Sequence, residues 1–354
     1  MTHLKKYSSL LVLLTALLTT IFINLSCEDN PVTPDEPPPG NSNYLVTVDT
    51  IDRNYTVHRT IWGTSENNMW AGGGGSENIW HYDGKKWEAL HPLPSSINSI
   101  YGFAENDIYA AAAEGRIFHF DGSEWYQQFR YGPDGNNPFH FTDIWGYSSF
   151  NIYAVGFYYE NHKSYGIIFH FDGTEWKQVN IPKTEGQIRR IRGDFSDKSK
   201  QYFILNNVDF ELPDSSRIFE LDNNYIREIY YGQLFGADRS TTPMIETVNG
   251  KLYFGFDRKI HFLSGKGFIA QKTINFQEYS NSFIGRSIND LIFAVFGGFV
   301  HYNGNEIKFL YKNENSFVIL DYTVTDNTFF AVGEDIDNRV NLVIKGILQN
   351  NEEQ

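Results

Sequence analysis

Hydrophobic and polar residues alternate in short runs along most of the chain after residue 44, and Gly, Asn and Asp residues separate these runs. The stretch RIFHF at residues 116–120 is one example. Alternation of this kind predicts strands with two different faces, whereas a helix needs apolar residues three or four positions apart. No stretch after residue 44 keeps helical spacing. The pattern therefore predicts an all-β fold.

The strand-like runs belong to an internal repeat. Segments 61–87, 100–125 and 144–176 share the pattern I-[WY]-G, a polar turn, [MI]-[WY]-A, a Gly-containing loop and I-[WF]-H-[YF]-D-G-x-x-W. Weaker copies start near residues 190, 245 and 284, and a half copy spans 321–348. One turn position marks the copies at intervals of 38, 51, 50, 42 and 39 residues, at Gly84, Gly122, Gly173, Asn223, Gly265 and Gly304. Such spacing is typical of β-propeller blades.

Each copy supplies four strands. The Asp-Gly pair between the third and fourth strands predicts a tight hairpin in which both residues take positive φ. The tryptophan that follows is expected to pack between blades, at Trp87, Trp125 and Trp176. The half copy lacks a fourth strand, and the run at residues 44–51 is left over. Because an open ring would expose a sheet edge, we predict a seven-bladed β-propeller over residues 44–350, closed by this N-terminal strand. Six blades with a C-terminal appendage is the alternative.

The copies resemble the repeats of bacterial extracytoplasmic β-propeller lipoproteins, of the kind I-W-G…H-Y-D-G-x-x-W. Their D-G-x-x-W ending is also similar to that of Asp-box and photosystem-assembly-factor-like propellers. An Asp box reads S-x-D-x-G-x-x-W, and here Asp and Gly are adjacent, so the resemblance does not extend to sialidase-like enzymes. It implies the fold and an exported location, but no reaction, because propellers host many unrelated functions.

The N-terminus has the features of an export signal. Lys5 and Lys6 precede an apolar run that ends at Ile23 and is shorter than a membrane-spanning helix requires. Cys27, the only cysteine, follows in a segment that resembles a lipobox, although Asn24 stands where that pattern prefers Leu. We therefore predict a lipoprotein signal peptide over residues 1–26 and a lipid on Cys27. An uncleaved anchor helix and a chance cysteine are the alternatives.

Residues 27–43 are rich in proline and begin with acidic residues, which favours an extended tether between the lipid and the propeller. The lipid on Cys27 makes the membrane an expected partner. The resulting location is the cell envelope, with the outer membrane or the cell surface favoured over the inner membrane.

The net charge of −14 argues against nucleic acid as a partner. Binding to a polyanion requires clustered Lys and Arg side chains. The chain offers only Arg189, Arg190 and Arg192 as a cluster, and the predicted signal removes two further lysines.

Candidate residues for chemistry are explained by the repeat. A single cysteine excludes disulfides within the chain and multi-thiolate metal sites. His81, His119, His170 and His301 each stand two residues before the turn, so they occupy one strand position in different blades and predict a structural role, with no metal or cofactor. The run of glycines at residues 72–75 has no helix pattern after it, so we interpret it as a loop between strands and not as a phosphate site.

Three aromatic loops break the repeat on consecutive blades, and loops on one face usually carry the function of a propeller. We predict that they contact a ligand through Tyr131, His140, Tyr158, Tyr159, His162, Tyr165, Tyr231 and Arg239. The alternative is that these loops only cover each other.

Together these features favour a monomeric, membrane-tethered binding or scaffold module for a protein or glycan, and leave open whether the chain is an enzyme. The alternative function is a carbohydrate-active hydrolase or lyase that uses the aromatic face. Two carboxylates within about 5–10 Å of each other in a cleft would favour that alternative.

Overall fold

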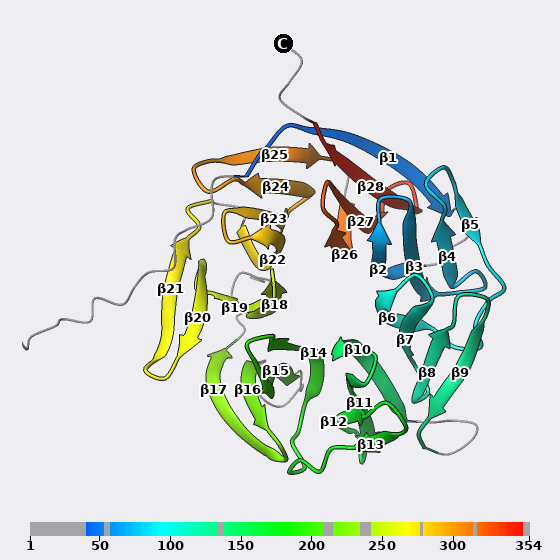
Figure 1. The fold of residues 1–354 in the computed structure, drawn as a ribbon, viewed down its shortest axis with the longest axis vertical. Helices are drawn as coiled ribbons and strands as arrows, with labels where there is room; N and C mark the ends of the chain where they lie inside the picture. Colours follow the sequence, from blue (N-terminus) through cyan, green and yellow to red (C-terminus); the bar gives the residue numbers. More distant parts are fainter. Residues whose placement is uncertain are drawn as a thin grey trace, which may run out of the picture. The chain divides into compact units, whose positions relative to one another are not determined.

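Seven four-stranded antiparallel sheets form a ring in the part of the chain that the structure, a computed structural model, describes (Figure 1). Their innermost strands line a central channel. The described residues are 40–52, 57–132, 138–207, 215–233, 242–276, 279–313 and 317–349. Over these ranges no helix is long and apolar enough to cross a membrane. The fold is the predicted seven-bladed β-propeller.

The first strand of each blade lies innermost, beside the channel, and the fourth lies outermost. Blade 1 contains β2 (Val57–Ser65), β3 (Asn68–Gly74), β4 (Ile79–Tyr82) and β5 (Trp87–Ala89). Blade 2 contains β6 (Ile97–Ala104), β7 (Asp107–Ala112), β8 (Arg116–Phe120) and β9 (Trp125–Arg130). Blade 3 contains β10 (Phe139–Ser148), β11 (Asn151–Glu160), β12 (Lys163–Phe171) and β13 (Trp176–Gln178).

The remaining blades follow the same order. Blade 4 contains β14 (Gln187–Asp194), β15 (Asp197–Asn207), β16 (Ser215–Asp222) and β17 (Tyr225–Gln233). Blade 5 contains β18 (Met244–Val248), β19 (Lys251–Phe256), β20 (Lys259–Ser264) and β21 (Gly267–Thr273). Blade 6 contains β22 (Tyr279–Ser287), β23 (Asp290–Val295), β24 (Gly298–Tyr302) and β25 (Ile307–Lys312).

Blade 7 joins the two ends of the propeller. Its strands are β26 (Phe317–Val324), β27 (Thr328–Asp335), β28 (Val340–Leu348) and the N-terminal strand β1 (Tyr44–Asp52). β1 pairs antiparallel with β28, from Tyr44 opposite Leu348 to Asp52 opposite Asn341. The predicted closure is therefore confirmed, and the six-bladed alternative is wrong.

The Asp-Gly turns have a different geometry from the predicted one. Gly84 has a φ of 91°, but Asp83 is not among the residues with positive φ. Four residues, 83–86, separate β4 from β5. The carboxylate of Asp83 accepts the backbone N–H groups of Lys85 and Lys86, both at 2.9 Å. This side-chain bonding makes a longer Asx turn, so the expectation of a tight hairpin with two positive φ values is wrong.

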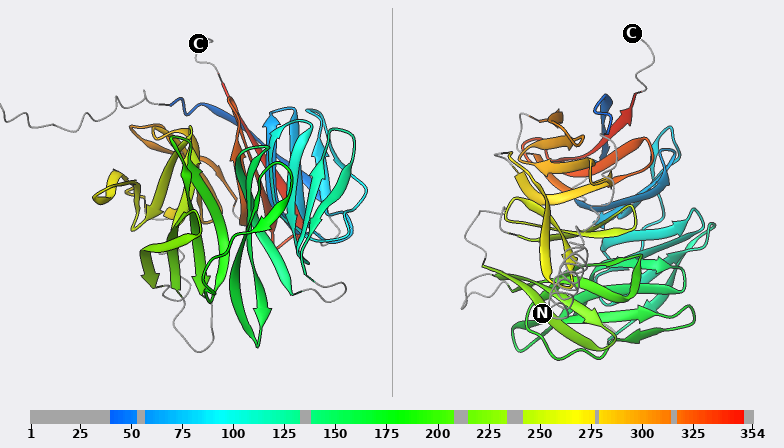
Figure 2. Two further views of the ribbon diagram at one scale, coloured as in Figure 1. Left: turned by 60° about the horizontal axis from the view of Figure 1, so that its bottom comes forward. Right: turned by 60° about the vertical axis from the view of Figure 1, so that its left-hand side comes forward.

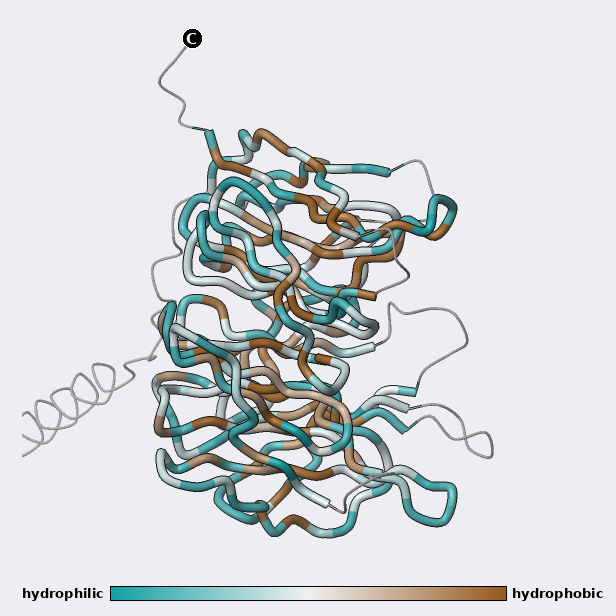
Figure 3. The backbone as a smooth tube through the Cα atoms, turned by 90° about the vertical axis from the view of Figure 1, so that its right-hand side faces the viewer, coloured by the Kyte–Doolittle hydropathy of each residue, from teal (hydrophilic) through white to brown (hydrophobic). Residues whose placement is uncertain are grey.

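The aromatic side chains of the repeat pack between blades, as predicted. The ring of Trp125 in blade 2 lies 5.4 Å from that of Trp70 in blade 1. Trp176 in blade 3 donates its indole N–H to Gln128 of blade 2 at 2.9 Å. Figure 3 shows hydrophobic stretches within the blades and hydrophilic ones at the projecting hairpin ends.

The repeated histidines bond within their own blades. Each Nε2 atom contacts the side chain at the start of the second strand: His81–Asn68 at 2.7 Å, His119–Asp107 at 2.8 Å, His170–Asn151 at 2.9 Å and His301–Asp290 at 2.7 Å. Each histidine thus connects the third strand of its blade to the beginning of the second strand, beside the first turn. This is a structural role, of the kind that the repeat predicts.

The glycine run does not form the expected loop. Gly72, Gly73 and Gly74 all belong to β3. A Cβ atom on Gly73 would lie 1.9 Å from the carbonyl oxygen of Val57, and one on Gly72 would lie 2.7 Å from Ile97 in blade 2. The glycines therefore allow neighbouring backbones to approach closely.

Candidate functional site

The innermost strands line a cavity of about 390 Å³ in the central channel. We call the face where these strands begin the mouth face, and the face where they end the far face. The mouth face also carries the hairpins between second and third strands, including the long β11–β12 hairpin, which projects in Figure 2.

Five innermost strands contain the same irregularity near the mouth face. In each of these strands, the residue two positions before a buried core residue has no partner in the register with the second strand, which is the pattern of a β-bulge. The bulged residues are Arg59, Asn98, Thr142, Arg189 and Leu320, in blades 1, 2, 3, 4 and 7. A bulge changes the direction of a side chain, and all five of these residues line the channel.

The same five residues also line a second cavity of about 580 Å³, which opens the channel toward the mouth face. We call this cavity the mouth. Its other lining residues are Val57, Ser96, Ala113, His140 and Phe157. The two cavities share their five bulged residues, so a ligand in the mouth would contact the same ring of side chains that borders the channel below.

Two arginines bring positive charge to the mouth. Arg59, which is exposed, donates from Nη1 to the Oδ1 atom of Asn98 at 3.1 Å. Arg189, also exposed, donates from Nη1 to the Oε1 atom of Gln187 at 3.1 Å. Among the described residues, no carboxylate forms an ion pair with either arginine. Within the described part of the chain, each of these guanidinium groups therefore bonds to a neutral amide oxygen.

His140 and Phe157 form an aromatic side of the mouth. Their rings stack with centroids 5.3 Å apart. The exposed ring of Tyr159 meets both, at 6.2 Å from His140 and 5.3 Å from Phe157. Burial lowers the pKa of His140, so the imidazole is neutral at pH 7 and adds no charge to the arginines.

Below the mouth, a ring of hydrogen bonds joins neighbouring blades. In four of the five blades with a bulge, the side chain that follows the bulge accepts a backbone N–H from the next blade. The bonds run from Ile61 to Asp321 at 3.0 Å, Ile100 to Thr60 at 3.1 Å, Ile144 to Ser99 at 3.3 Å and Ile191 to Asp143 at 2.9 Å. Burial raises the pKa of Asp321. These polar side chains hold the blades together.

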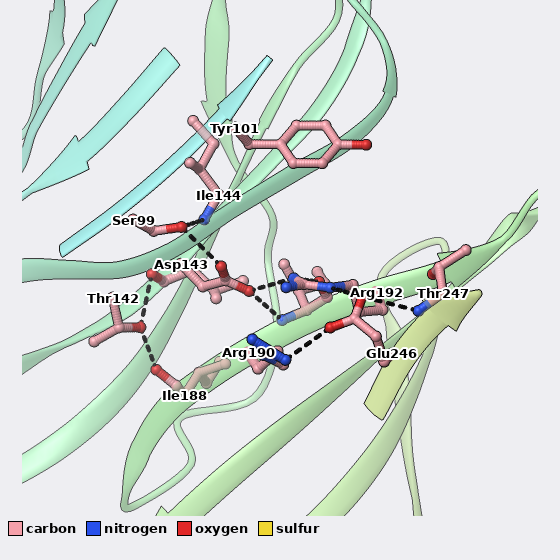
Figure 4. Close-up of polar contacts among 12 residues, drawn as sticks. Ser99, Tyr101, Thr142, Asp143, Ile144, Ile188, Arg190, Arg192, Glu246 and Thr247 are labelled. Atoms are coloured by element: carbon pink, nitrogen blue, oxygen red, sulfur yellow. Dashed lines mark hydrogen bonds and ion pairs between the residues drawn. The ribbon is translucent and has the colours of Figure 1, made fainter. Parts of the chain in front are cut away.

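An ion-pair network extends this ring across blades 3, 4 and 5 (Figure 4). Arg192 donates to Asp143 at 2.7 Å and to Glu246 at 3.0 Å. Arg190 binds the other oxygen of Glu246 at 2.8 Å. Burial alone would lower the pKa of Arg192, but the charges of Asp143 and Glu246 raise it above its usual range. The four charges balance each other.

The channel therefore contains two carboxylates that bind the same guanidinium group, Asp143 and Glu246. Asp143 also accepts the hydroxyl of Ser99 at 3.0 Å. Each carboxylate is thus occupied by several donors. This is the geometry of a network that stabilises the ring, whereas a catalytic pair needs oxygens that can reach a substrate.

Aromatic rings line the channel on the side of blades 1 to 3. Equivalent positions of the three blades hold Trp62, Tyr101 and Trp145. The ring centroid of Tyr101 lies 6.2 Å from that of Trp62 and 6.4 Å from that of Trp145. Burial raises the pKa of Tyr101 to about 12. The channel thus has an aromatic wall beside its charged wall.

The predicted loop residues fall into different environments. Tyr131 and Tyr158 pack against Phe139, at 4.8 and 5.2 Å between ring centroids. Lys183 lies 4.1 Å above the ring of Tyr165. Each of these three half-buried rings therefore contacts a neighbouring side chain.

The other predicted residues are more accessible. Tyr159 is 50% exposed and Tyr231 is 58% exposed. His162 is exposed at the tip of the β11–β12 hairpin, with a φ of 66°. Arg239 lies outside the described residues. Of the predicted set, His140 lines the mouth and Tyr159 borders it.

Sequence reasoning missed most of the mouth. The predicted ligand-binding residues did not include Arg59, Asn98, Phe157 or Leu320. Arg189 was named only as part of a basic cluster. One signal was present: in the first four blades, the bulged residue stands two positions before the isoleucine of the repeat. Among the described residues, no group of three or more His, Cys, Asp or Glu side chains is placed to hold a metal ion.

No family model and no curated protein matches the sequence. Solved structures with the same fold do match. A virginiamycin B lyase from Staphylococcus aureus with quinupristin has a TM-score of 0.63 at 13% identity, over 87% of this chain and 100% of that chain. YCF48 bound to D1 peptide has a TM-score of 0.55 at 12% identity, over 90% of this chain and 100% of that chain.

A third similar structure is BBS1N in complex with ARL6DN, with a TM-score of 0.54 at 12% identity, over 88% of this chain and 99% of that chain. All three are β-propeller proteins with different functions: a lyase, a protein bound to a peptide and a subunit bound to a protein. At these identities the likeness shows the fold alone.

Proposed function

We propose that this chain is a binding module that receives a segment of a partner protein in the mouth of its central channel. The observation that carries the proposal is the mouth itself, a cavity of about 580 Å³ that contains five bulged residues. The bulged positions have no partner in the strand register, so sheet formation alone does not require the side chains found there. Two of the similar propellers were solved with a peptide or a protein bound.

The carbohydrate-active alternative receives less support from the channel. Asp143 and Glu246 both bind Arg192. A hydrolase would have to release these oxygens before they could act as acid or base. The geometry therefore supports binding better than hydrolysis.

The first described residues bind the far face of blade 6. Gly40 donates its backbone N–H to the carbonyls of Asn289 and Asn303, at 3.1 and 2.8 Å. Ser42 contacts Nδ1 of His301 at 2.8 Å. Asn289 and Asn303 lie in turns on the far face, so this contact leaves the mouth uncovered.

Selection of peptides from a random display library by the full chain tests the proposal. Leu320→Trp fills the mouth without changing its charge, and we expect it to abolish retention of the selected peptides. Phe296→Trp is the matched control, because Phe296 is 85% exposed in a hairpin outside the mouth. Peptides that bind Leu320→Trp as tightly as the unaltered chain would place the binding surface elsewhere and refute the proposal.

We further propose that Cys27 carries a lipid and that the chain acts as a monomer in the cell envelope, at the outer membrane or the cell surface. The support is the basic and apolar signal followed by the single cysteine. Cys27→Ser should release the protein from the membrane fraction. Unchanged partitioning of this variant would instead indicate an uncleaved anchor helix.

A further inference from the structure

We propose that the mouth selects an acidic peptide segment, with a carboxylate between Arg59 and Arg189 and an adjacent apolar side chain against Phe157 and Leu320. This inference rests on the proposed function and assigns the chemistry of its ligand.

The first argument is the distribution of charge. The chain has a net charge of −14, and the other two arginines of the channel, Arg190 and Arg192, are ion-paired with acidic residues. Arg59 and Arg189 lack such a partner among the described residues, yet they come from blades 1 and 4 to line one cavity. Guanidinium groups bind carboxylates through strong, charge-assisted hydrogen bonds.

The repeat does not explain these two arginines. The equivalent bulged positions in blades 2, 3 and 7 hold Asn98, Thr142 and Leu320. A bulge in this strand therefore forms with neutral side chains as well, and the strand does not require a cation there. The positive charge is particular to the mouth of this chain.

Two neutral polar side chains of the mouth are already engaged. Asn98 donates to the carbonyl of Phe141 at 2.7 Å and accepts from Arg59. The hydroxyl of Thr142 contacts the carbonyls of Val155 and Ile188. The other neutral polar side chains of the mouth are Ser96 and His140, which are few for the many hydroxyl groups of a sugar. A buried hydroxyl without a hydrogen bond is unfavourable.

Four of the ten lining residues are apolar. They offer surface that an aliphatic or aromatic side chain can cover, and they are Val57, Ala113, Phe157 and Leu320. Two guanidinium groups that bond only to neutral amides among the described residues lie beside this surface, and they suit a carboxylate next to an apolar residue. An acidic peptide combines these groups, and an acidic glycan does not.

The test uses the same peptide library with the full chain. We expect the selected peptides to be enriched in Asp or Glu next to an apolar residue. Their binding should weaken by about tenfold or more when the acidic residues are replaced by the corresponding amides. It should also weaken between about 0.1 M and about 1 M salt, because salt screens exposed charges.

The protein variants provide the second arm. The double variant Arg59→Gln, Arg189→Gln should lose the preference for acidic peptides and bind them at least about tenfold more weakly. Arg339→Gln is the matched control, since Arg339 is exposed in the β27–β28 hairpin and lines neither cavity. Its affinity for the peptides should stay unchanged, and thermal unfolding checks that each variant is folded.

Three outcomes would overturn the inference: selected peptides without acidic enrichment, full binding by the folded double variant, or preferential binding of an oligogalacturonate, which would make the occupant an acidic glycan. If peptides bind through the mouth, as Leu320→Trp reports, but ignore both arginines, only the carboxylate assignment fails. If Leu320→Trp has no effect, the proposed function itself fails.

Discussion

Replacing Asp143 by alanine tests whether the channel network stabilises the propeller. Asp143 binds Arg192 at 2.7 Å, the backbone N–H of Ile191 at 2.9 Å and the hydroxyl of Ser99 at 3.0 Å. The network contains two cations and two anions, so the substitution leaves one uncompensated positive charge in a buried place. Breaking one partner of a buried pair costs about 3–5 kcal/mol.

Urea unfolding followed by tryptophan fluorescence measures this loss as a shift of the midpoint at constant slope. Asp49→Ala is the control, because Asp49 is exposed on β1, and surface changes of this kind usually stay within about 0.5 kcal/mol. The combination Asp143→Leu, Arg192→Met should recover part of the loss, since it removes both members of the pair. A loss below about 1 kcal/mol in Asp143→Ala would refute the structural role of the network.

Three further outcomes follow from the fold. Deleting residues 44–51 should lower the melting temperature and promote association through the bare edge of β28; calorimetry and light scattering check this, and an unchanged, monodisperse protein would contradict it. Gly73→Ala should destabilise by about 1–3 kcal/mol in urea, whereas Gly265→Ala, whose Cβ would meet nothing within 4 Å, should be neutral. Burial lowers the pKa of His170 in the folded protein below 6.5, its value in the unfolded chain. The unfolded chain therefore binds the proton more tightly, and the free energy of unfolding should decrease as the pH falls below 6.5. His170→Gln should reduce this pH dependence, measured as the melting temperature at each pH.

The number of blades could be predicted from the sequence because every complete copy of the repeat contains its own turn residues. Turn residues such as Gly84 and Gly122 mark each repeat. The half copy at residues 321–348 lacked a fourth strand, and the run at residues 44–51 was the strand left unassigned. The turn geometry was not accessible, because an Asp-Gly pair occurs in both short and long hairpins. Only the bonds from Lys85 and Lys86 to Asp83 distinguish the two.

The residues of the mouth could not be predicted from the sequence, for a physical reason. A β-bulge is defined by pairing between two strands, and its residues here are as different as an arginine and a leucine. Arg59 and Arg189 are far apart in the chain, and only closure of the ring brings blades 1 and 4 around one cavity. The aromatic loops could be singled out from the sequence because they interrupt the repeat locally, but the contacts of Tyr131 and Tyr158 with Phe139 could not be predicted from it.

The pairing of β1 with β28 has a consequence for how the chain folds. All the other strands of the propeller lie between Tyr44 and its partner Leu348 in the sequence. β1 therefore has no partner until β28 is present, and joining such distant segments is slow. A chain that lacks β28 would keep an open ring with an exposed sheet edge, and species of this kind are prone to aggregate.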